Sequence, residues 1–269
     1  VDGSIITSDG ENQYKAILNK YFKFDDLLHN KLTNLKEKIY NSKDLNAFAK
    51  DLVGIEKELT LFHAKVVNTI IKEINIDIDF IGFHGQTIFH SSKEKITKQL
   101  GDGPLLSKIT KKKVVYDFRQ NDLTNGGEGA PLAPIFHKLI VKQNKIKLPV
   151  TILNIGGISN ITSINENFEI SSSDIGPGNC LIDKWVKLNS NKKYDENGLI
   201  ARSGNIDKFI LDQSLDNFYN NEISKNKSYD INDFDLSFLR GLTLENGAAT
   251  ITEFTAEICS KNIINKNIY

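Results

Sequence analysis

The amino-acid sequence predicts an α/β protein built from two units. Helical periodicity dominates residues 24 to 71, and two-residue periodicity follows directly at 76 to 83. The opposite order occurs later, where three strand-like segments between 148 and 176 precede helical segments that continue to Ile264. Because strands alternate with helices in both parts, we expect each part to bury its own sheet under helices.

The amino-acid composition is that of a globular protein and gives no sign of nucleic-acid or membrane binding. The 269 residues with 39% hydrophobic content are enough for a large core. Lys plus Arg and Asp plus Glu each total 34, and this balance gives no electrostatic footprint for nucleic acid or an anionic membrane. We therefore expect no nucleic-acid partner and no membrane partner, but a small, compact ligand.

Cysteine usage and apolar runs indicate a cytoplasmic location. Cys180 and Cys259 are the two cysteines, and they lack the paired spacing of a disulfide framework or a zinc site. No apolar run approaches the ~20 residues that cross a bilayer, and the first residues lack a signal pattern. The chain begins at Val1 and contains no Met, so we expect a processed, truncated or incompletely represented start.

The first unit is expected to open with a short strand and a long helical region. Residues 3 to 7 predict a strand that turns at 8 to 10, where the glycine can take a positive φ. Between 24 and 71, Asp44 is expected to cap a segment through Asp51. Four apolar residues fall on one helical face: Leu59, Phe62, Val66 and Ile70.

Two strands and a loop are expected next. Residues 76 to 83 alternate, with Ile76, Ile78 and Phe80 on one face and Asp77 and Asp79 on the other. Residues 111 to 118 predict a second strand, which a loop rich in Gly and Asn follows. A linking helix is expected to begin near Pro134.

The second unit begins near Leu148. The segments 148 to 157 and 158 to 164 predict a hairpin with a glycine turn, and a third antiparallel strand follows a turn at 165 to 167. The next segment predicts a helix, followed by further helices. Its apolar side is expected to carry Leu181, Ile182 and Trp185.

A polar cluster follows the strand at 76 to 83. His84, Gly85, Gln86 and Thr87 offer donors and acceptors at a strand terminus, where they can converge on a ligand with several hydroxyls. The alternative is a polar turn in which the backbone satisfies the histidine. His90 has no companion pattern, and we expect it to be structural.

A second group surrounds a glycine pair in the expected loop between 117 and 134. It comprises Asp117, Arg119, Asp122 and Glu128. Arg119 can make a bidentate contact to a carboxylate, so a carboxylate-bearing sugar would suit it. The alternative is an internal Arg–Asp ion pair that fixes the loop.

The motif "NIGGISN", from Asn154 to Asn160, places Gly156 and Gly157 between two strands. Backbone N–H groups there can approach phosphate oxygens without side-chain obstruction. The motif is neither of the common glycine-rich phosphate loops, and a simple hairpin explains the glycines equally well.

The segment "SDIGPGNCLIDKW" is the most suggestive of chemistry. Asp174 is expected to end a strand before a turn of Gly176, Pro177 and Gly178, where a general base can be held at a sheet edge. The alternative is a helix cap. Asp183 can serve a metal or the structure, and Asn179 can position a ligand or stabilise the turn.

Several motifs in order resemble the anhydro-N-acetylmuramic acid kinase family, ATP-dependent enzymes of cell-wall recycling. They are "IGFHGQTIFH", "GDGPLL", "VVYDFRQNDLTNGGEGAPLAP", "LNIGGISNIT", "DIGPGNCLIDKW" and "YDENGLIARSG", and weaker likeness extends over nearly the whole chain. The resemblance implies two ribonuclease-H-like halves of the actin, Hsp70 and hexokinase type, at residues 1–135 and 136–269. The first half and the C-terminal end would be incomplete.

The resemblance also implies a reaction and its residues. Water would attack C1 of the 1,6-anhydro sugar and O6 would receive the γ-phosphoryl group, giving N-acetylmuramic acid 6-phosphate. Asp174 would be the base, and His84, Gly85, Gln86, Thr87, Arg119 and Asp122 would bind the sugar. ATP would be bound by Asn154, Gly156, Gly157, Asn160, Gly176, Gly178 and Asn179, with Mg²⁺ on the phosphates. The resemblance implies no particular metal ligands; it suggests a homodimer.

Some expected family features are absent from the sequence. The phosphate loop GTSxDG does not precede "VDGSIIT", and the glycine-rich adenosine segment would lie beyond Tyr269. The stretch "NFYNNEISKN" from Asn217 replaces a proline-rich segment, and Glu128 stands where glutamine is common. We therefore expect a large fragment of a kinase. The alternatives are a catalytically silent carbohydrate-binding module, or an actin-like scaffold or phosphatase that hydrolyses nucleotide without the sugar.

Overall fold

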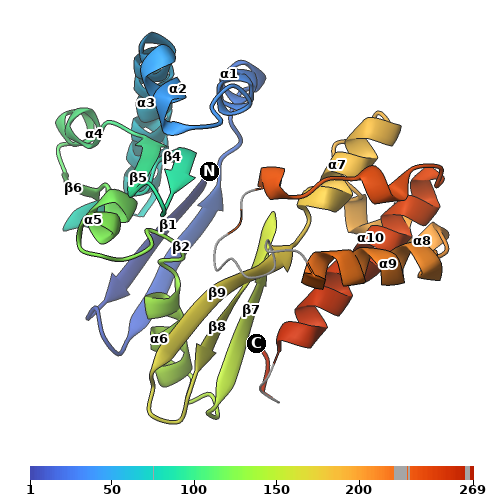
Figure 1. Ribbon diagram of the computed structural model, residues 1–269. Coiled ribbons are helices and arrows are strands. Elements are labelled where there is room, and N and C mark those ends of the chain that lie inside the picture. The colour runs from blue at the N-terminus through green and yellow to red at the C-terminus, as the bar shows by residue number, and fades with distance from the viewer. Residues whose placement is uncertain (75, 221–228, 230, 264–266) are drawn as a thin grey trace. The chain divides into compact units, whose positions relative to one another are not determined.

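The computed structural model describes residues 1–74, 76–220, 229, 231–263 and 267–269, so most of the stretch from Asn217 lies outside the described residues. Two compact units make up the chain, Val1–Leu132 and Ala133–Tyr269. Each contains helices and strands, and the α/β class is therefore confirmed (Figure 1). No helix in the described ranges is long and apolar enough to cross a membrane.

The first unit combines short sheets with helices. Strands β1 and β2 pair antiparallel, as do β4 and β5, whereas β3 and β6 pair parallel. The strands are β1 (Asp2–Ser8), β2 (Tyr14–Tyr21), β3 (Phe80–Phe83), β4 (Gln86–Ser91), β5 (Ile96–Leu100) and β6 (Lys113–Tyr116). The helices are α1 (Asp26–Lys36), α2 (Ser42–Ala47), α3 (Ala49–Ile74), α4 (Gly103–Thr110) and α5 (Phe118–Thr124).

The predicted opening strand and its turn are confirmed, with Gly10 at φ 82°. Strand β2 was not predicted. The helical region is confirmed. Asp44 was predicted to cap a segment through Asp51, but it is not the N-cap residue and its helix ends at Ala47. Asn41 is the N-cap of α2, and Asp44 occupies the third helical position, where its carboxylate accepts from the N–H groups of Tyr40 and Asn41. This reciprocal arrangement is a capping box.

The apolar face of α3 forms much of the core of this unit. Leu59, Val66 and Ile70 are buried, and Phe62 packs beside them, which confirms the predicted face. Burying one such side chain fully is worth about 1.5–3 kcal/mol. The helix therefore contributes several such increments to the stability of the unit.

The strand predicted at 76 to 83 is shorter and faces the other way. It begins only at Phe80, a residue that is 62% exposed, whereas Ile81 and Phe83 face the core against Leu106. The prediction that Ile76, Ile78 and Phe80 form the strand's apolar face was therefore wrong. Because β3 packs against α4, its odd-numbered residues Ile81 and Phe83 form the buried face. The predicted strand within 111 to 118 is confirmed as β6.

The predicted loop after β6 begins with a helix instead. Arg119 and Asp122 lie on α5, so their expected placement in a loop was wrong. Asp117 precedes the helix with a left-handed backbone at φ 66°. The irregular chain begins after Asn125, where the glycine pair lies.

The second unit carries one three-stranded antiparallel sheet of β7 (Val150–Ile155), β8 (Ile158–Ile164) and β9 (Ile170–Pro177), which confirms the predicted meander. Near the C-terminus, Thr151 and Leu153 of β7 bond to residues 267 to 269. The α-helices are α6 (Pro134–Gln143), α7 (Cys180–Asn189), α8 (Leu199–Ser203), α9 (Lys208–Asn220) and α10 (Leu244–Asn262), with short 3₁₀ turns η1 (Glu196–Gly198), η3 (Ile231–Asp233) and η4 (Ser237–Leu239).

Helices α7 to α10 gather beyond one end of this sheet (Figure 1). Their core contains Leu181 and Trp185 of α7 with Ile251 and Ile258 of α10, and Ile182 packs against it, as predicted for this face. The Trp185 indole N–H donates to the carbonyl of Leu244 at 2.9 Å. This core fixes α7, and with it the segment that joins α7 to β9.

Candidate functional site

The turn from His84 to Thr87 connects β3 to β4. Gly85 has a left-handed backbone at φ 69°, and a Cβ atom there would lie 2.1 Å from the carbonyl oxygen of Leu100. Glycine is therefore required both by its φ and by the close approach of β5. The close neighbour of Gly85 in the structure is the chain itself, rather than an open space for a ligand.

Arg119 and His84, which were both predicted to bind the sugar, lie together. The Arg119 Nε–H donates to Nε2 of His84 at 2.9 Å, and Nη1 donates to the Gly129 carbonyl at 3.1 Å. Because Nε2 of His84 accepts, its proton lies on Nδ1, which is 3.0 Å from the Gly85 carbonyl. The guanidinium is thus oriented by the turn on one side and by the glycine loop on the other.

Asp122 shapes the glycine loop at residues 126 to 129. Its Oδ2 accepts a hydrogen bond of 2.8 Å from the Gly129 N–H, and a Cβ atom on Gly127 would lie 2.1 Å from the same oxygen. Since Gly129 also receives the Arg119 hydrogen bond, Asp122 positions the acceptor that orients Arg119. Its predicted direct contact with sugar stays a prediction.

A series of side-chain hydrogen bonds that begins at Thr87 of the turn was not predicted. Gln99 Nε2 donates to the hydroxyl oxygens of Thr97 at 2.7 Å and of Thr87 at 3.3 Å. His90 Nδ1 lies 3.2 Å from the same Thr97 hydroxyl. Burial, and then the charge of Arg119, lower the pKa of His90. The register of the β4–β5 hairpin, which pairs Thr87 with Gln99, could have revealed these hydrogen bonds.

In the second unit, two predicted motifs form one structure. Gly156 and Gly157 join β7 to β8, as the hairpin interpretation predicted. The Gly156 carbonyl accepts from the Asn179 N–H at 2.8 Å, and the Gly157 carbonyl accepts from the Gly178 N–H at 3.0 Å. A Cβ atom on Gly178 would lie 2.3 Å from the Gly156 oxygen, and one on Gly176 would lie 2.7 Å from Ile258. Because Gly178 and Gly176 have no side chain, the chain can pack closely against Gly156 and Ile258 at these two positions.

The glycine hairpin remains accessible on its other side. Among the described residues, a Cβ atom on Gly157 would meet nothing closer than Ile231 at 3.6 Å, and the Gly157 N–H donates to no acceptor. Asn179 also donates through Nδ2 to the Ile155 carbonyl at 3.3 Å. The hairpin thus offers a backbone donor whose surroundings leave space for an anion.

A row of polar residues crosses the sheet beside this hairpin. Asn154 pairs with Asn160, and Asn160 pairs with Asp174, so the three side chains share one face. The prediction that Asp174 ends its strand was wrong, because β9 continues to Pro177. Asp174 is also no helix cap, since the helix that follows begins at Cys180.

Tyr229, which was not singled out in the sequence, orients Asp174. Its backbone N–H donates to Asp174 Oδ2 at 2.9 Å. Burial, and then the neighbouring Asp174 carboxylate, raise the pKa of the Tyr229 hydroxyl to about 12. The hydroxyl therefore stays protonated at neutral pH. Asp174 itself is half-buried, and one of its carboxylate oxygens accepts the Tyr229 N–H bond.

A cavity of about 700 Å³ opens beside Asn179, between α7, α8 and α10. Asp183, Tyr194, Arg202 and Glu253 are among its lining residues. Burial raises the pKa of Asp183. The volume falls within the range of small-molecule sites, and the carboxylates supply acceptors for hydroxyl groups. Among the described residues, no cluster of three or more His, Cys, Asp or Glu is placed to hold a metal ion.

Comparison with known proteins gives a consistent result. The sequence profile of the family described as "Anhydro-N-acetylmuramic acid kinase" matches residues 1–267. Relatives bearing this name are 52% identical in Pelagibacter ubique, over 98% of this chain and 71% of the relative, and 34% identical in Brucella canis, over 97% and 71%. A third, from Zymomonas mobilis, is 36% identical over 98% of this chain and 73% of its own length.

Proposed function

Because this chain belongs to the anhydro-N-acetylmuramic acid kinase family, we propose that it opens 1,6-anhydro-N-acetylmuramic acid and phosphorylates O6 at the expense of ATP. The observation that carries the proposal is the position of Asp174. Asp174 lies in a row with Asn160 and Asn154 on three adjacent strands, two of which are joined by the accessible Gly156–Gly157 hairpin. A base and a phosphate-binding backbone thus belong to one sheet.

Asp174 acts as the general base. Water is a poor nucleophile, so the carboxylate accepts its proton as the new bond from water oxygen to C1 forms. The bond between C1 and O6 breaks, O6 takes the γ-phosphoryl group, and ADP leaves. The Tyr229 N–H donates to Oδ2 of Asp174 and so restricts the orientation of the carboxylate. Fixed orientation of this kind lowers the entropic part of the barrier.

The cluster around Arg119 binds the sugar. Its guanidinium is fixed by His84 and Gly129, and a forked donor of this kind matches the lactyl carboxylate of a muramic acid. Gly85, Gln86 and Thr87 bring the remaining hydrogen-bonding groups of the turn. Asp122 contributes by holding the Gly129 loop in place.

The nucleotide lies along the glycine hairpin. The Gly157 N–H faces its phosphates, and Gly156 closes the same hairpin through its own N–H bond to the Ile158 carbonyl. Gly176 and Gly178 keep the neighbouring chain close, and Asn179 links the hairpin to the cavity. The adenosine occupies that cavity. When bound, Mg²⁺ neutralises charge on the phosphates, and it needs only one or two protein carboxylates because nucleotide oxygens and water complete its shell.

Two further expectations are also part of the proposal. The meander β7–β9 followed by helices supports a ribonuclease-H-like half at 136–269, with a second such half at 1–135. A homodimer is proposed from the family resemblance. The catalytically silent alternative is not favoured, because relatives named as kinases match along 98% of this chain.

A coupled ADP-release assay on the full-length protein tests the proposal. With Mg-ATP, we expect ADP only when the anhydro sugar is present, together with an equal amount of sugar 6-phosphate. ADP release that does not depend on the sugar would contradict the proposal and would favour an actin-like or phosphatase activity.

A further inference from the structure

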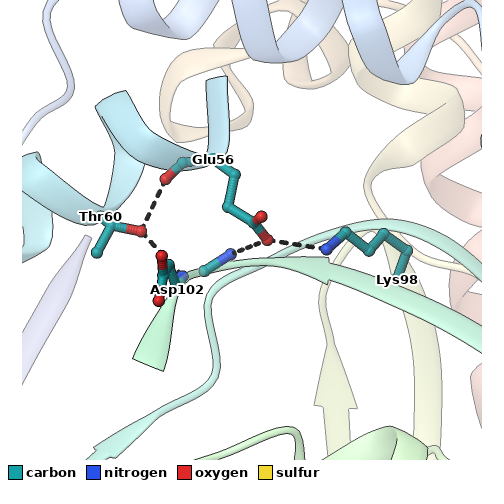
Figure 2. Close-up of polar contacts among 5 residues, drawn as sticks. Glu56, Thr60, Lys98 and Asp102 are labelled. Atoms are coloured by element: carbon teal, nitrogen blue, oxygen red, sulfur yellow. Dashed lines mark hydrogen bonds and ion pairs between the residues drawn. The ribbon is translucent and has the colours of Figure 1, made fainter. Parts of the chain in front are cut away.

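Two adjacent backbone N–H groups after β5 are held by one helix. The Gly101 N–H donates to Glu56 Oε1 at 3.1 Å, and the Asp102 N–H donates to Thr60 Oγ1 at 3.0 Å. Glu56 and Thr60 lie one turn apart on α3, so both side chains point to the same short segment (Figure 2). The segment Gly101–Asp102 is therefore fastened to the long helix at two consecutive positions.

This attachment is shielded from solvent. Thr60 is fully buried and donates to the Glu56 carbonyl at 2.7 Å, while the Glu56 side chain is 21% exposed. Lys98 Nζ lies 2.8 Å from the same Glu56 Oε1 that Gly101 uses (Figure 2). One oxygen thus receives a charged and a neutral donor. Reduced contact with water strengthens such bonds.

The fastened segment supports the turn at residues 84 to 87. A Cβ atom on Gly85 would lie 2.1 Å from the Leu100 oxygen and 3.5 Å from the Gly101 Cα, and one on Gly101 would lie 2.8 Å from the Phe83 ring. Gln86 pairs with Leu100 in the β4–β5 ladder. Because the backbone at Leu100–Gly101 packs directly against the backbone at Gly85, a displacement of Gly101 would also displace the turn.

We propose that Glu56 is a positioning residue for sugar binding. It touches no substrate; through the Gly101 N–H it fixes the Leu100–Gly101 backbone, and that backbone fixes the turn that presents His84 and Thr87. The inference rests on the proposed sugar-binding role of the turn. Neither Glu56 nor Thr60 belongs to a motif that the sequence pattern singled out.

Calorimetric titration of the full-length protein with the anhydro sugar tests this role. Glu56→Ala removes the acceptor, and we expect about tenfold weaker sugar binding, as for loss of one hydrogen bond to a charged group. Glu56→Gln keeps an oxygen at the same reach and should bind sugar nearly as wild type does. Glu56→Asp keeps the charge but is one methylene shorter, so its affinity should fall like that of the alanine variant.

Glu58→Ala is the matched control. Glu58 lies on the same helix and pairs with Lys31 at 2.7 Å, without contact to Gly101. Its loss should leave sugar affinity unchanged, and ATP affinity should be unchanged in all four variants. Equal sugar affinity of wild type, Glu56→Ala and Glu56→Asp would overturn the inference. Absence of sugar binding by the wild-type protein would instead overturn the proposed function on which the inference rests.

Discussion

The Nε–H of Arg119 donates a hydrogen bond of 2.9 Å to Nε2 of His84, across 35 residues of sequence. The two residues come from α5 and from the turn after β3. Their contact turns two separate sequence signals into one cluster with a fixed guanidinium. A planar fork oriented in this way is suited to a carboxylate.

Replacing Arg119 should weaken sugar binding. Arg119→Ala removes the fork, so the dissociation constant for the anhydro sugar should rise roughly 10- to 100-fold, the effect of losing charged hydrogen bonds. Arg119→Lys should recover only part of this affinity because an ammonium group cannot bind in a forked manner. Calorimetry measures both. Arg240→Ala, at an exposed arginine, is the control, and unchanged affinity in Arg119→Ala would remove Arg119 from the site.

The glycine hairpin gives a second prediction from two matched substitutions. Gly157→Ala places a methyl group in ordinary contact, 3.6 Å from Ile231, so stability should be unchanged while the KM for ATP rises by about tenfold through obstruction of the phosphates. Gly178→Ala forces a methyl group to 2.3 Å from the Gly156 oxygen and should lower the melting temperature. An unchanged ATP KM in Gly157→Ala would show that no phosphate approaches there.

The origin of the oxygen atoms distinguishes sugar phosphorylation from nucleotide hydrolysis. In water enriched in heavy oxygen, the phosphoryl group of the product should carry no solvent oxygen, since O6 comes from the sugar itself. Hydrolysis would place solvent oxygen in inorganic phosphate. Mass spectrometry of the phosphorylated product and of free phosphate reads both, and labelled inorganic phosphate formed in step with ADP would argue against the kinase reaction.

Buried histidines make stability depend on pH. Burial lowers the pKa of His63, whose ring packs against Phe24, Phe62 and Phe83. The unfolded chain therefore binds a proton more readily, and the free energy of unfolding should fall as pH drops below about 6.5 and through the lower folded pKa. In His63→Phe the fall should be smaller, whereas His29→Gln, at an exposed position, should behave as wild type. Urea titrations between pH 7.5 and 5 give the free energy of unfolding at each pH. The same dependence of this free energy on pH in the wild type, His63→Phe and His29→Gln would contradict the prediction.

The meander of the second unit was predictable because its signals are local. Short apolar runs bounded by Gly156–Gly157 and by the turn at Asn165 predict strands and hairpins from neighbouring residues alone. Strand β2 was missed because its residues are mostly exposed, so they show no two-residue alternation. The face of β3 was misassigned because packing against α4 decided it.

The supporting residues of the candidate site could not be predicted in the same way. Glu56 meets Gly101 across 45 residues, and Tyr229 meets Asp174 across 55. Neither pair shares a periodic pattern, because tertiary packing alone brings them together. The reactive residue types could be recognised from their sequence motifs, whereas the backbone and side-chain groups that orient them became visible only in the folded chain.

The most direct test of the central claim is the single-turnover rate of Asp174→Asn with Mg-ATP and the anhydro sugar, measured beside its sugar affinity. If Asp174 removes the proton from the attacking water, the rate should fall by about 10²- to 10⁴-fold while the sugar dissociation constant stays within a few-fold of wild type. A variant that binds the sugar normally and turns over at the wild-type rate would contradict the account.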